Sequence, residues 1–137
     1  MELRIEHPAN FPSAAIMYVN GNVDGSNYQE LVKQGQTLYA AGVRCIALEL
    51  SQCGYMSSSG LVALNIITKL LRAESLPDIE NGWATLKLLD DARAARGKAP
   101  LALVNPTLRV QHVLDLAGLG TLLPIYSDIA SALAALA

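Results

Sequence analysis

Two short apolar runs, at residues 45–50 and 101–104, constrain the fold of this chain most strongly. Runs of this length are typical of strands that are covered on both faces, as in parallel sheets. Each run precedes a segment whose apolar residues recur at helical spacing, residues 61–71 after the first and 108–117 after the second. Short strands that alternate with helices indicate a largely parallel α/β sheet.

Two strands and a helix are expected before the first run. Residues 2–6 alternate apolar and charged side chains, as an edge strand does, and residues 14–20 resume a strand after a proline-containing turn. These two strands are expected to pair as an antiparallel hairpin. Apolar residues then follow at helical spacing from Tyr28 to Tyr39, with Asp24 or Ser26 as the expected N-cap and Gly42 as the end of the helix.

The last third of the chain predicts two more helices and a strand. A helix is expected to start at Asn105-Pro106-Thr107, with proline at an early helical position, and to end at Gly118. Its apolar face is predicted to comprise Leu108, Val110, Val113, Leu114 and Ala117. Residues 122–126 form a short strand in which Pro124 favours an edge position, and Ser127-Asp128 caps a final helix.

The segment from about residue 73 to 86 is irregular and holds the only tryptophan, Trp83. Trp83 either anchors a partner or folds this segment back onto the domain. A helical pattern resumes over residues 86–96. The expected architecture is one α/β domain over residues 1–137, with a mixed, mostly parallel sheet of about five strands and four to five helices.

Composition narrows the classes of function. The net charge is −2 and no basic stripe is visible, so no nucleic-acid partner is expected. No apolar run reaches membrane-spanning length and no secretory signal is visible. Cys45 and Cys53 are expected to be reduced thiols of a cytoplasmic protein.

Signals of catalysis and of cofactor binding are weak. The serines at 57–59 lack the Gly-x-Ser-x-Gly frame, since Met56 occupies the first glycine position. The glycines match no dinucleotide fingerprint or P-loop, and His7 and His112 have no metal-ligand spacing. We therefore expect a protein that is not an enzyme, with no catalytic residue, cofactor or metal.

Three serines, Ser57-Ser58-Ser59, lie between the strand at 45–50 and the helix that follows it. A serine hydroxyl can cap a helix by bonding an N–H group of the first turn. The positive end of the helix dipole also tolerates a phosphate on a serine placed there. Taken alone, the run is more simply interpreted as a plain cap that is never modified, although three serines leave at least one hydroxyl over.

Four stretches, in order along the chain, resemble the STAS domain of anti-sigma factor antagonists and of the cytoplasmic tails of sulfate transporters. They are Val19-Asn20-Gly21-Asn22-Val23-Asp24, Ala47-Leu48-Glu49-Leu50-Ser51, Tyr55-Met56-Ser57-Ser58-Ser59-Gly60-Leu61, and Leu103 to Pro106 together with Val113 to Leu119. No single stretch is specific, but the ordered set spans nearly the whole chain. Relative to the family pattern, the segment near 73–86 is an insertion.

The resemblance implies the residues of a site. The phosphoacceptor of the family falls on Ser58, two residues before the motif glycine Gly60, with Ser57 and Ser59 as secondary candidates. Ser57 stands where the family pattern usually has an acidic residue. Asp24 matches an acidic residue near the acceptor, and the residues implied to contact partners are Asn22, Asp24, Ser57, Ser59 and Gly60.

The resemblance also implies a function. The unphosphorylated protein would bind a serine kinase that doubles as an anti-sigma factor, phosphorylation of Ser58 would release it, and a serine phosphatase would reset it. The alternative is a constitutive STAS-fold scaffold or regulatory subunit, in a stress-signalling assembly or as a transporter accessory, that is never phosphorylated. Ser57 and the insertion favour the alternative somewhat.

Overall fold

The computed structural model describes residues 1–72, 99–118 and 123–136. The expected insertion near 73–86, the helical pattern at 86–96 and Trp83 lie outside the described residues.

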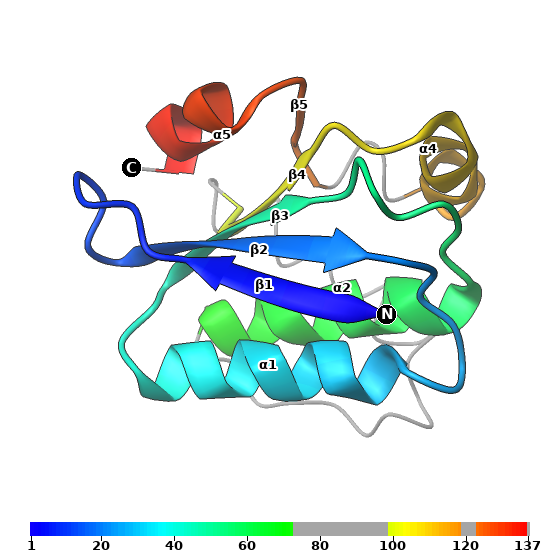
Figure 1. Cartoon of the computed structure of the whole chain (residues 1–137), viewed down its shortest axis with the longest axis horizontal. Helices are drawn as coiled ribbons and strands as arrows, with labels where there is room; N and C mark the ends of the chain where they lie inside the picture. Colours follow the sequence, from blue (N-terminus) through cyan, green and yellow to red (C-terminus); the bar gives the residue numbers. More distant parts are fainter. Residues whose placement is uncertain (73–98, 119–122, 137) are drawn as a thin grey trace.

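A five-stranded sheet forms the centre of the molecule (Figure 1). Its strands lie in the order of the sequence: β1 (Glu2–Glu6), β2 (Ala14–Asn20), β3 (Cys45–Glu49), β4 (Leu101–Val104) and β5 (Ile125–Tyr126). β1 pairs antiparallel with β2, and every other pair is parallel. The expected hairpin, the mostly parallel sheet and the edge position of the last strand are thus confirmed, but Pro124 lies before β5 and not within it as predicted.

Helices cover both faces of the sheet. α1 (Tyr28–Ala40) and α2 (Ser58–Leu71) pack side by side below one face, and α5 (Ile129–Leu136) packs on the other face over β3, β4 and β5. α4 (Leu108–Leu116) lies between β4 and β5 in the sequence. The four described helices agree with the expected α/β class.

The ends of α1 combine a correct and an incorrect prediction. Gly42 has φ +104° and ends the helix: its N–H donates to the carbonyl of Tyr39, and the Val43 N–H donates to that of Leu38. This is the Schellman arrangement, which favours glycine. The N-cap position, however, is occupied by Asn27 and not by Asp24 or Ser26.

The start of α4 also differs from the prediction. Thr107 is the N-cap, and its hydroxyl oxygen accepts from the Val110 N–H at 3.3 Å. Pro106 therefore lies just outside the helix, not at its first position. Leu108 was expected on the buried face but is 87 % exposed, and Leu116 is 75 % exposed, so only Val110 and Leu114 are fully buried from this helix.

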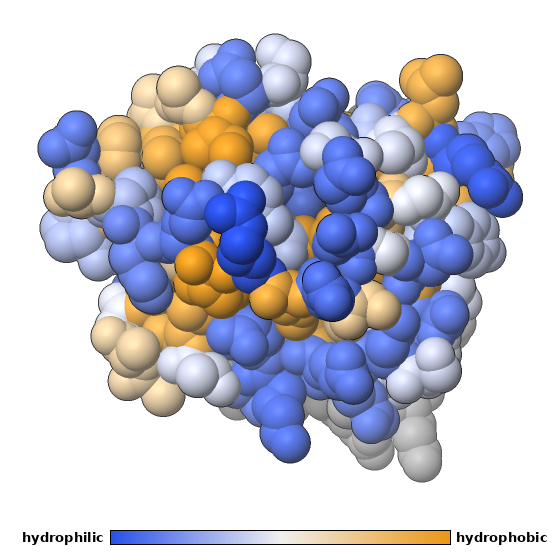
Figure 2. All heavy atoms as spheres, in the orientation of Figure 1, coloured by the Kyte–Doolittle hydropathy of each residue, from blue (hydrophilic) through white to orange (hydrophobic). Residues whose placement is uncertain are grey.

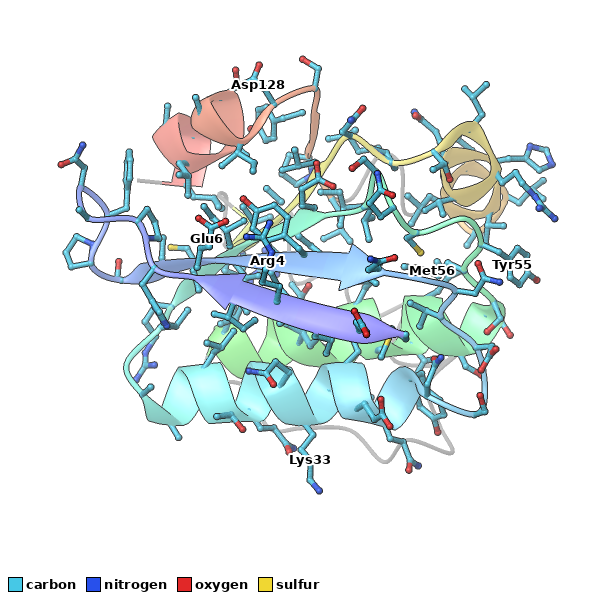
Figure 3. All side chains as sticks on the ribbon, in the orientation of Figure 1. Arg4, Glu6, Lys33, Tyr55, Met56 and Asp128 are labelled. Carbon is cyan, nitrogen blue, oxygen red and sulfur yellow. The ribbon has the colours of Figure 1, made fainter. Side chains whose placement is uncertain are left out.

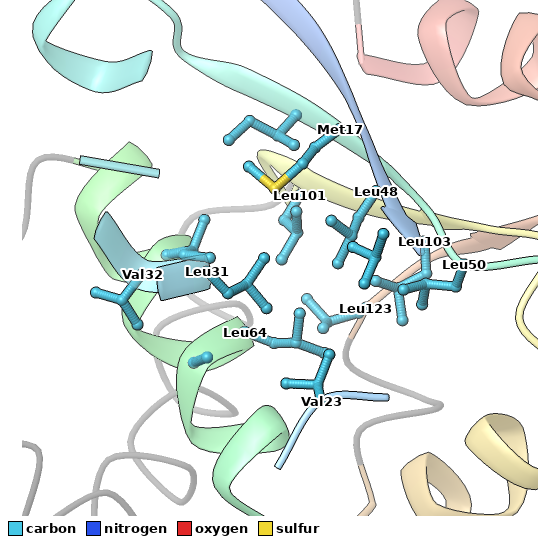
Figure 4. Packing of buried hydrophobic residues seen from close by; sticks show 14 of the residues in the cluster. Met17, Val23, Leu31, Val32, Leu48, Leu50, Leu64, Leu101, Leu103 and Leu123 are labelled. Carbon is cyan, nitrogen blue, oxygen red and sulfur yellow. The ribbon is translucent and has the colours of Figure 1, made fainter. Parts of the chain in front are cut away.

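The core has two parts, one on each face of the sheet. The larger lies between the sheet and the α1–α2 layer and includes Met17, Leu48 and Leu103 from the strands and Leu31 and Leu64 from the helices (Figure 4). The smaller lies under α5, where small strand residues such as Ala47 and Ala102 meet Ala132 and Leu133. β3 and β4 are buried on both faces, as their continuous apolar runs indicate.

Candidate functional site

The loop after β2 and the loop after β3 run side by side at the carboxyl ends of their strands. Val23 and Met56 form an isolated parallel bridge. The Val23 N–H donates to the Tyr55 carbonyl at 3.0 Å, and the Ser57 N–H donates to the Val23 carbonyl at 2.9 Å. The Gly21 N–H donates to the Gln52 carbonyl at 3.0 Å. These bonds place the loop that carries Asp24 beside the amino end of α2.

The three serines at the start of α2 have different environments. Ser57 is the N-cap: its hydroxyl oxygen accepts from the Ser59 N–H at 3.2 Å. Ser58 is the first helical residue and is exposed, and its hydroxyl makes no hydrogen bond with any other described residue. Ser59 is half-buried. Ser58 is therefore an exposed serine whose hydroxyl has no capping role, as the run of three serines predicts.

Gly60 is buried under the bridge between the two loops. A Cβ atom added at Gly60 would lie 2.3 Å from Cγ of Met56 and 3.1 Å from Cγ1 of Val23. Only a residue without a side chain fits there. Gly60 therefore has a packing role, and the partner contact that the resemblance implies for it stays a prediction.

Asp24 is held in a tight turn before α1. Its carboxylate accepts hydrogen bonds from both the hydroxyl and the backbone N–H of Ser26, the latter at 2.8 Å. These two bonds hold the pKa of Asp24 below its ordinary value, because they stabilise the charged form. The side chain of Asn27 closes the turn by accepting from the Asp24 N–H at 2.9 Å. These bonds therefore hold the Asp24 carboxylate in one orientation and favour its charged form.

The other loop residues of the predicted site lie close to this turn. Asn22 is exposed, and its side-chain oxygen would be 3.2 Å from a Cβ added at Gly54. A Cβ added at Gly25 would be 3.7 Å from Oγ of Ser59. The structure thus brings Asn22, Asp24 and the serines of α2 to one edge of the sheet.

The amino end of α4 adds residues to this edge that the sequence did not single out. The Thr107 hydroxyl donates to the Cys53 carbonyl at 3.1 Å, which ties α4 to the loop before α2. The Arg109 guanidinium lies 5.8 Å from the centre of the Tyr55 ring. Tyr55 is 39 % exposed at the rim of the molecule below α4 (Figure 3), and Leu108 is exposed. Leu108 was missed because helical spacing alone does not say which apolar residues face the core.

The chemistry available at this edge is that of a contact surface that carries the exposed hydroxyl of Ser58. Among the described residues, no group of histidine, cysteine and acidic side chains could hold a metal ion. Cys53 is buried, and burial raises the pKa of its thiol, which disfavours the reactive thiolate. None of the helices in the described part of the chain combines the length and the apolar character of a membrane span.

Comparisons with known proteins agree on the fold. No protein-family model and no functionally characterised protein matches the chain by sequence. A solved structure from Thermotoga maritima, assigned as an anti-sigma factor antagonist, is 20 % identical with a TM-score of 0.66 and covers 96 % of this chain and 92 % of its own. An anti-sigma factor antagonist from Mycobacterium paratuberculosis is 18 % identical with a TM-score of 0.65, covering 98 % and 92 %.

The anti-sigma factor antagonist SpoIIAA is similar in two forms. Its unphosphorylated structure is 15 % identical with a TM-score of 0.60, covering 95 % of this chain and 92 % of its own. Its phosphorylated structure, from Bacillus, is 14 % identical with a TM-score of 0.53, covering 95 % and 96 %. The similarity spans nearly the full length in each case, so this chain has the STAS fold of the anti-sigma factor antagonists.

Proposed function

We propose that this chain is a phosphorylation-switched binding module that acts as an anti-sigma factor antagonist, with Ser58 as the phosphoacceptor. One observation carries the proposal: Ser58 presents an exposed hydroxyl with no bond to another described residue, while its neighbour Ser57 caps the helix. Phosphorylation of Ser58 therefore breaks no hydrogen bond between described residues.

The electrostatics of the edge make the switch physically reasonable. A phosphate carries about −1.5 to −2 charges at neutral pH, and the amino end of a helix tolerates it without unfolding. The carboxylate of Asp24, ionised because of its bonds with Ser26, lies on the adjoining loop. A second anionic group beside it makes this edge strongly negative, so a partner adapted to the unphosphorylated surface loses affinity through repulsion and the cost of removing water from the phosphate.

The partner that we propose is a serine kinase that also serves as an anti-sigma factor, with a serine phosphatase to restore the free hydroxyl. Tyr55 and Leu108 provide exposed apolar surface at the same edge of the molecule, of the kind that protein interfaces use. We further propose that residues 1–137 form one domain, because all five described strands belong to one sheet. We place this domain in the cytoplasm, where the proposed kinase partner acts.

The decisive experiment uses a serine kinase of the same organism that also binds a sigma factor. The protein is incubated with the kinase and ATP, the added mass is assigned to a residue by peptide mass spectrometry, and kinase affinity is measured by calorimetry. We expect one phosphate on Ser58, none on the Ser58→Ala variant, and unchanged phosphorylation of Ser59→Ala. Ser58→Glu should bind the kinase at least about tenfold more weakly than wild type, because of the added charge.

Ser13→Glu is the matched control, since Ser13 is exposed just before β2, at the opposite edge of the sheet. It should bind the kinase like wild type. Unmodified Ser58 after full incubation, or Ser58→Glu binding as tightly as Ser13→Glu, would contradict the switch. Tight kinase binding without phosphorylation would instead indicate the constitutive module described above.

A further inference from the structure

The face of the sheet that carries α5 is only partly covered. α5 packs mainly on β3, β4 and β5 and also meets the amino-terminal half of β2, so the part of this face over β1 and the carboxyl end of β2 remains open (Figure 1). A hollow of about 470 Å³ occupies the open part, within the range of volumes found for ligand sites. Polar side chains from β1, β2 and the end of β3 dominate its lining: Glu2, Arg4, Tyr18, Asn20, Glu49 and Ser51.

The strand register brings these side chains together in two rows. Arg4 on β1 is opposite Tyr18 on β2, and Tyr18 is opposite Glu49 on β3. Glu2 is opposite Asn20 in the next row. Residues two apart on a strand face the same way, so both rows point into the hollow. Figure 2 shows strongly hydrophilic side chains gathered in the middle of this view, over β1 and β2.

The charges of the hollow do not balance within the described part of the chain. The Arg4 guanidinium is already paired, 3.1 Å from Oε1 of Glu6, and lies 3.9 Å from the centre of the Tyr18 ring; both side chains lie on the α5 side of β1 in Figure 3. Glu49 accepts the Ser51 N–H at 2.6 Å but forms no ion pair with another described residue, and neither does Glu2. Two carboxylates in the lining therefore have no ion-pair partner among the described residues.

The aromatic ring of Tyr18 also lines the hollow, beside the carboxylates of Glu2 and Glu49. Burial raises the pKa of the Tyr18 phenol, and the hydrogen bond with Glu6 and the nearby carboxylates of Glu6 and Glu49 raise it further. Arg4 already occupies one position over the ring, in the way that a guanidinium stacks on an aromatic face. A second cation entering the hollow meets Glu2 and Glu49 beside the same ring.

We propose that this hollow binds a lysine or arginine side chain of an extended segment of a partner protein. The carboxylates of Glu2 and Glu49 select the positive charge. A peptide is favoured over a small cation because β1 is an edge strand, paired only with β2 among the described strands, and edge strands accept an extended chain. The lining of the hollow includes neither Ser58 nor Asp24, so this site stands independently of the phosphorylation switch.

The test is a titration of ¹⁵N-labelled protein with a heptapeptide of alternating threonine and lysine whose termini are blocked. Binding is measured by NMR from the changes in the amide chemical shifts of the protein. The peptide with glutamate in place of lysine is the negative control. We expect shifts confined to β1, β2 and residues 49–52. The double variant Glu2→Gln/Glu49→Gln should bind the lysine peptide about tenfold more weakly, because both opposing charges are gone. Glutamine at 49 can still accept the Ser51 N–H, so the fold is retained, which the unperturbed spectrum checks.

Glu30→Gln is the matched variant, because Glu30 is an exposed carboxylate on α1, on the other side of the sheet. It should bind the peptide like wild type. Equal losses for Glu30→Gln and the double variant, or shifts spread evenly over the acidic surface, would overturn the site. Spermine binding as tightly as the peptide without moving the amides of β1 would overturn the assignment to a partner chain and indicate a small-cation site.

Discussion

Val23 and Met56 form the bridge that joins the two loops of the candidate site, and both are fully buried. Gly60 packs directly beneath them, at distances that leave no room for a side chain. The position of Ser58 relative to Asp24 therefore depends on a buried contact that neither residue makes itself. Substitutions at buried residues such as Gly60 should therefore alter the geometry of the site without changing its exposed side chains.

Gly60→Ala should destabilise the protein. The added Cβ would lie 2.3 Å from Cγ of Met56, so Met56 must move out of its place beside Val23. Overpacking of this kind costs about 1–3 kcal/mol, reduced by the better helix propensity of alanine. The measurement is the free energy of unfolding in urea. Gly25→Ala is the control, because its Cβ would meet only Oγ of Ser59 at 3.7 Å; if both variants unfold alike, the packing argument fails.

Ser57 and Ser58 should differ sharply when each is replaced by alanine. Ser57→Ala removes the hydroxyl that accepts the Ser59 N–H and should lower the free energy of unfolding by about 0.5–2 kcal/mol. Ser58→Ala removes an exposed hydroxyl without a partner among the described residues and should change it by less than about 0.5 kcal/mol. Ser57→Asp should keep the stability, since aspartate also caps helices well. Equal effects of the two alanine variants would reject the division of roles.

The division between Ser57 and Ser58 also marks a limit of prediction from sequence. The apolar runs predicted β3 and β4 because strands buried on both faces leave a continuous pattern. The glycines Gly42 and Gly118 predicted the ends of α1 and α4, and both have positive φ. Which serine caps α2 is decided by where the chain leaves the bridge with Val23, a tertiary contact that local spacing does not contain.

The same limit explains the errors at α4. Leu108 was predicted on the apolar face, yet it is exposed, because the helix buries only the face that carries Val110 and Leu114. Pro106 was expected inside the helix, but Thr107 is the N-cap. The Thr107 hydroxyl accepts from the Val110 N–H and donates to the Cys53 carbonyl, and both bonds stabilise this start of the helix. The second of these partners is 54 residues away in the sequence.

Thr107→Val should loosen the attachment of α4 to the candidate site. Valine keeps the shape of threonine but loses the hydroxyl, so the Val110 N–H loses its cap and the Cys53 carbonyl loses its donor. We expect a loss of about 0.5–2 kcal/mol in the free energy of unfolding, with faster amide exchange in the first turn of α4. Thr107→Ser retains the hydroxyl and should stay near wild type. Indistinguishable exchange in the two variants would argue against the tie.

Asp24 should titrate below the ordinary aspartate range. Its pKa is lowered chiefly by the bond from the Ser26 hydroxyl, so Ser26→Ala should raise it toward the usual value of about 3.9. A lowered folded-state pKa means that the charged carboxylate stabilises the fold above the unfolded pKa, and that this contribution disappears as the pH falls through the folded pKa. Carboxyl ¹³C shifts followed against pH give the value. Asp128, bonded by Ser131, is the control and should not respond to Ser26→Ala.

Gly35 and Ile67 should be energetically coupled across the α1–α2 interface. A Cβ added at Gly35 would lie 3.0 Å from Cγ1 of Ile67, so Gly35→Val should cost about 1–3 kcal/mol through overpacking. Ile67→Ala leaves a cavity and should cost about 2–5 kcal/mol. In the double variant the valine fills part of that cavity, so the combined loss should be smaller than the sum of the single losses by about 0.5–3 kcal/mol. Urea unfolding of the four proteins completes the cycle, and strictly additive losses would show that the two helices do not meet at this pair.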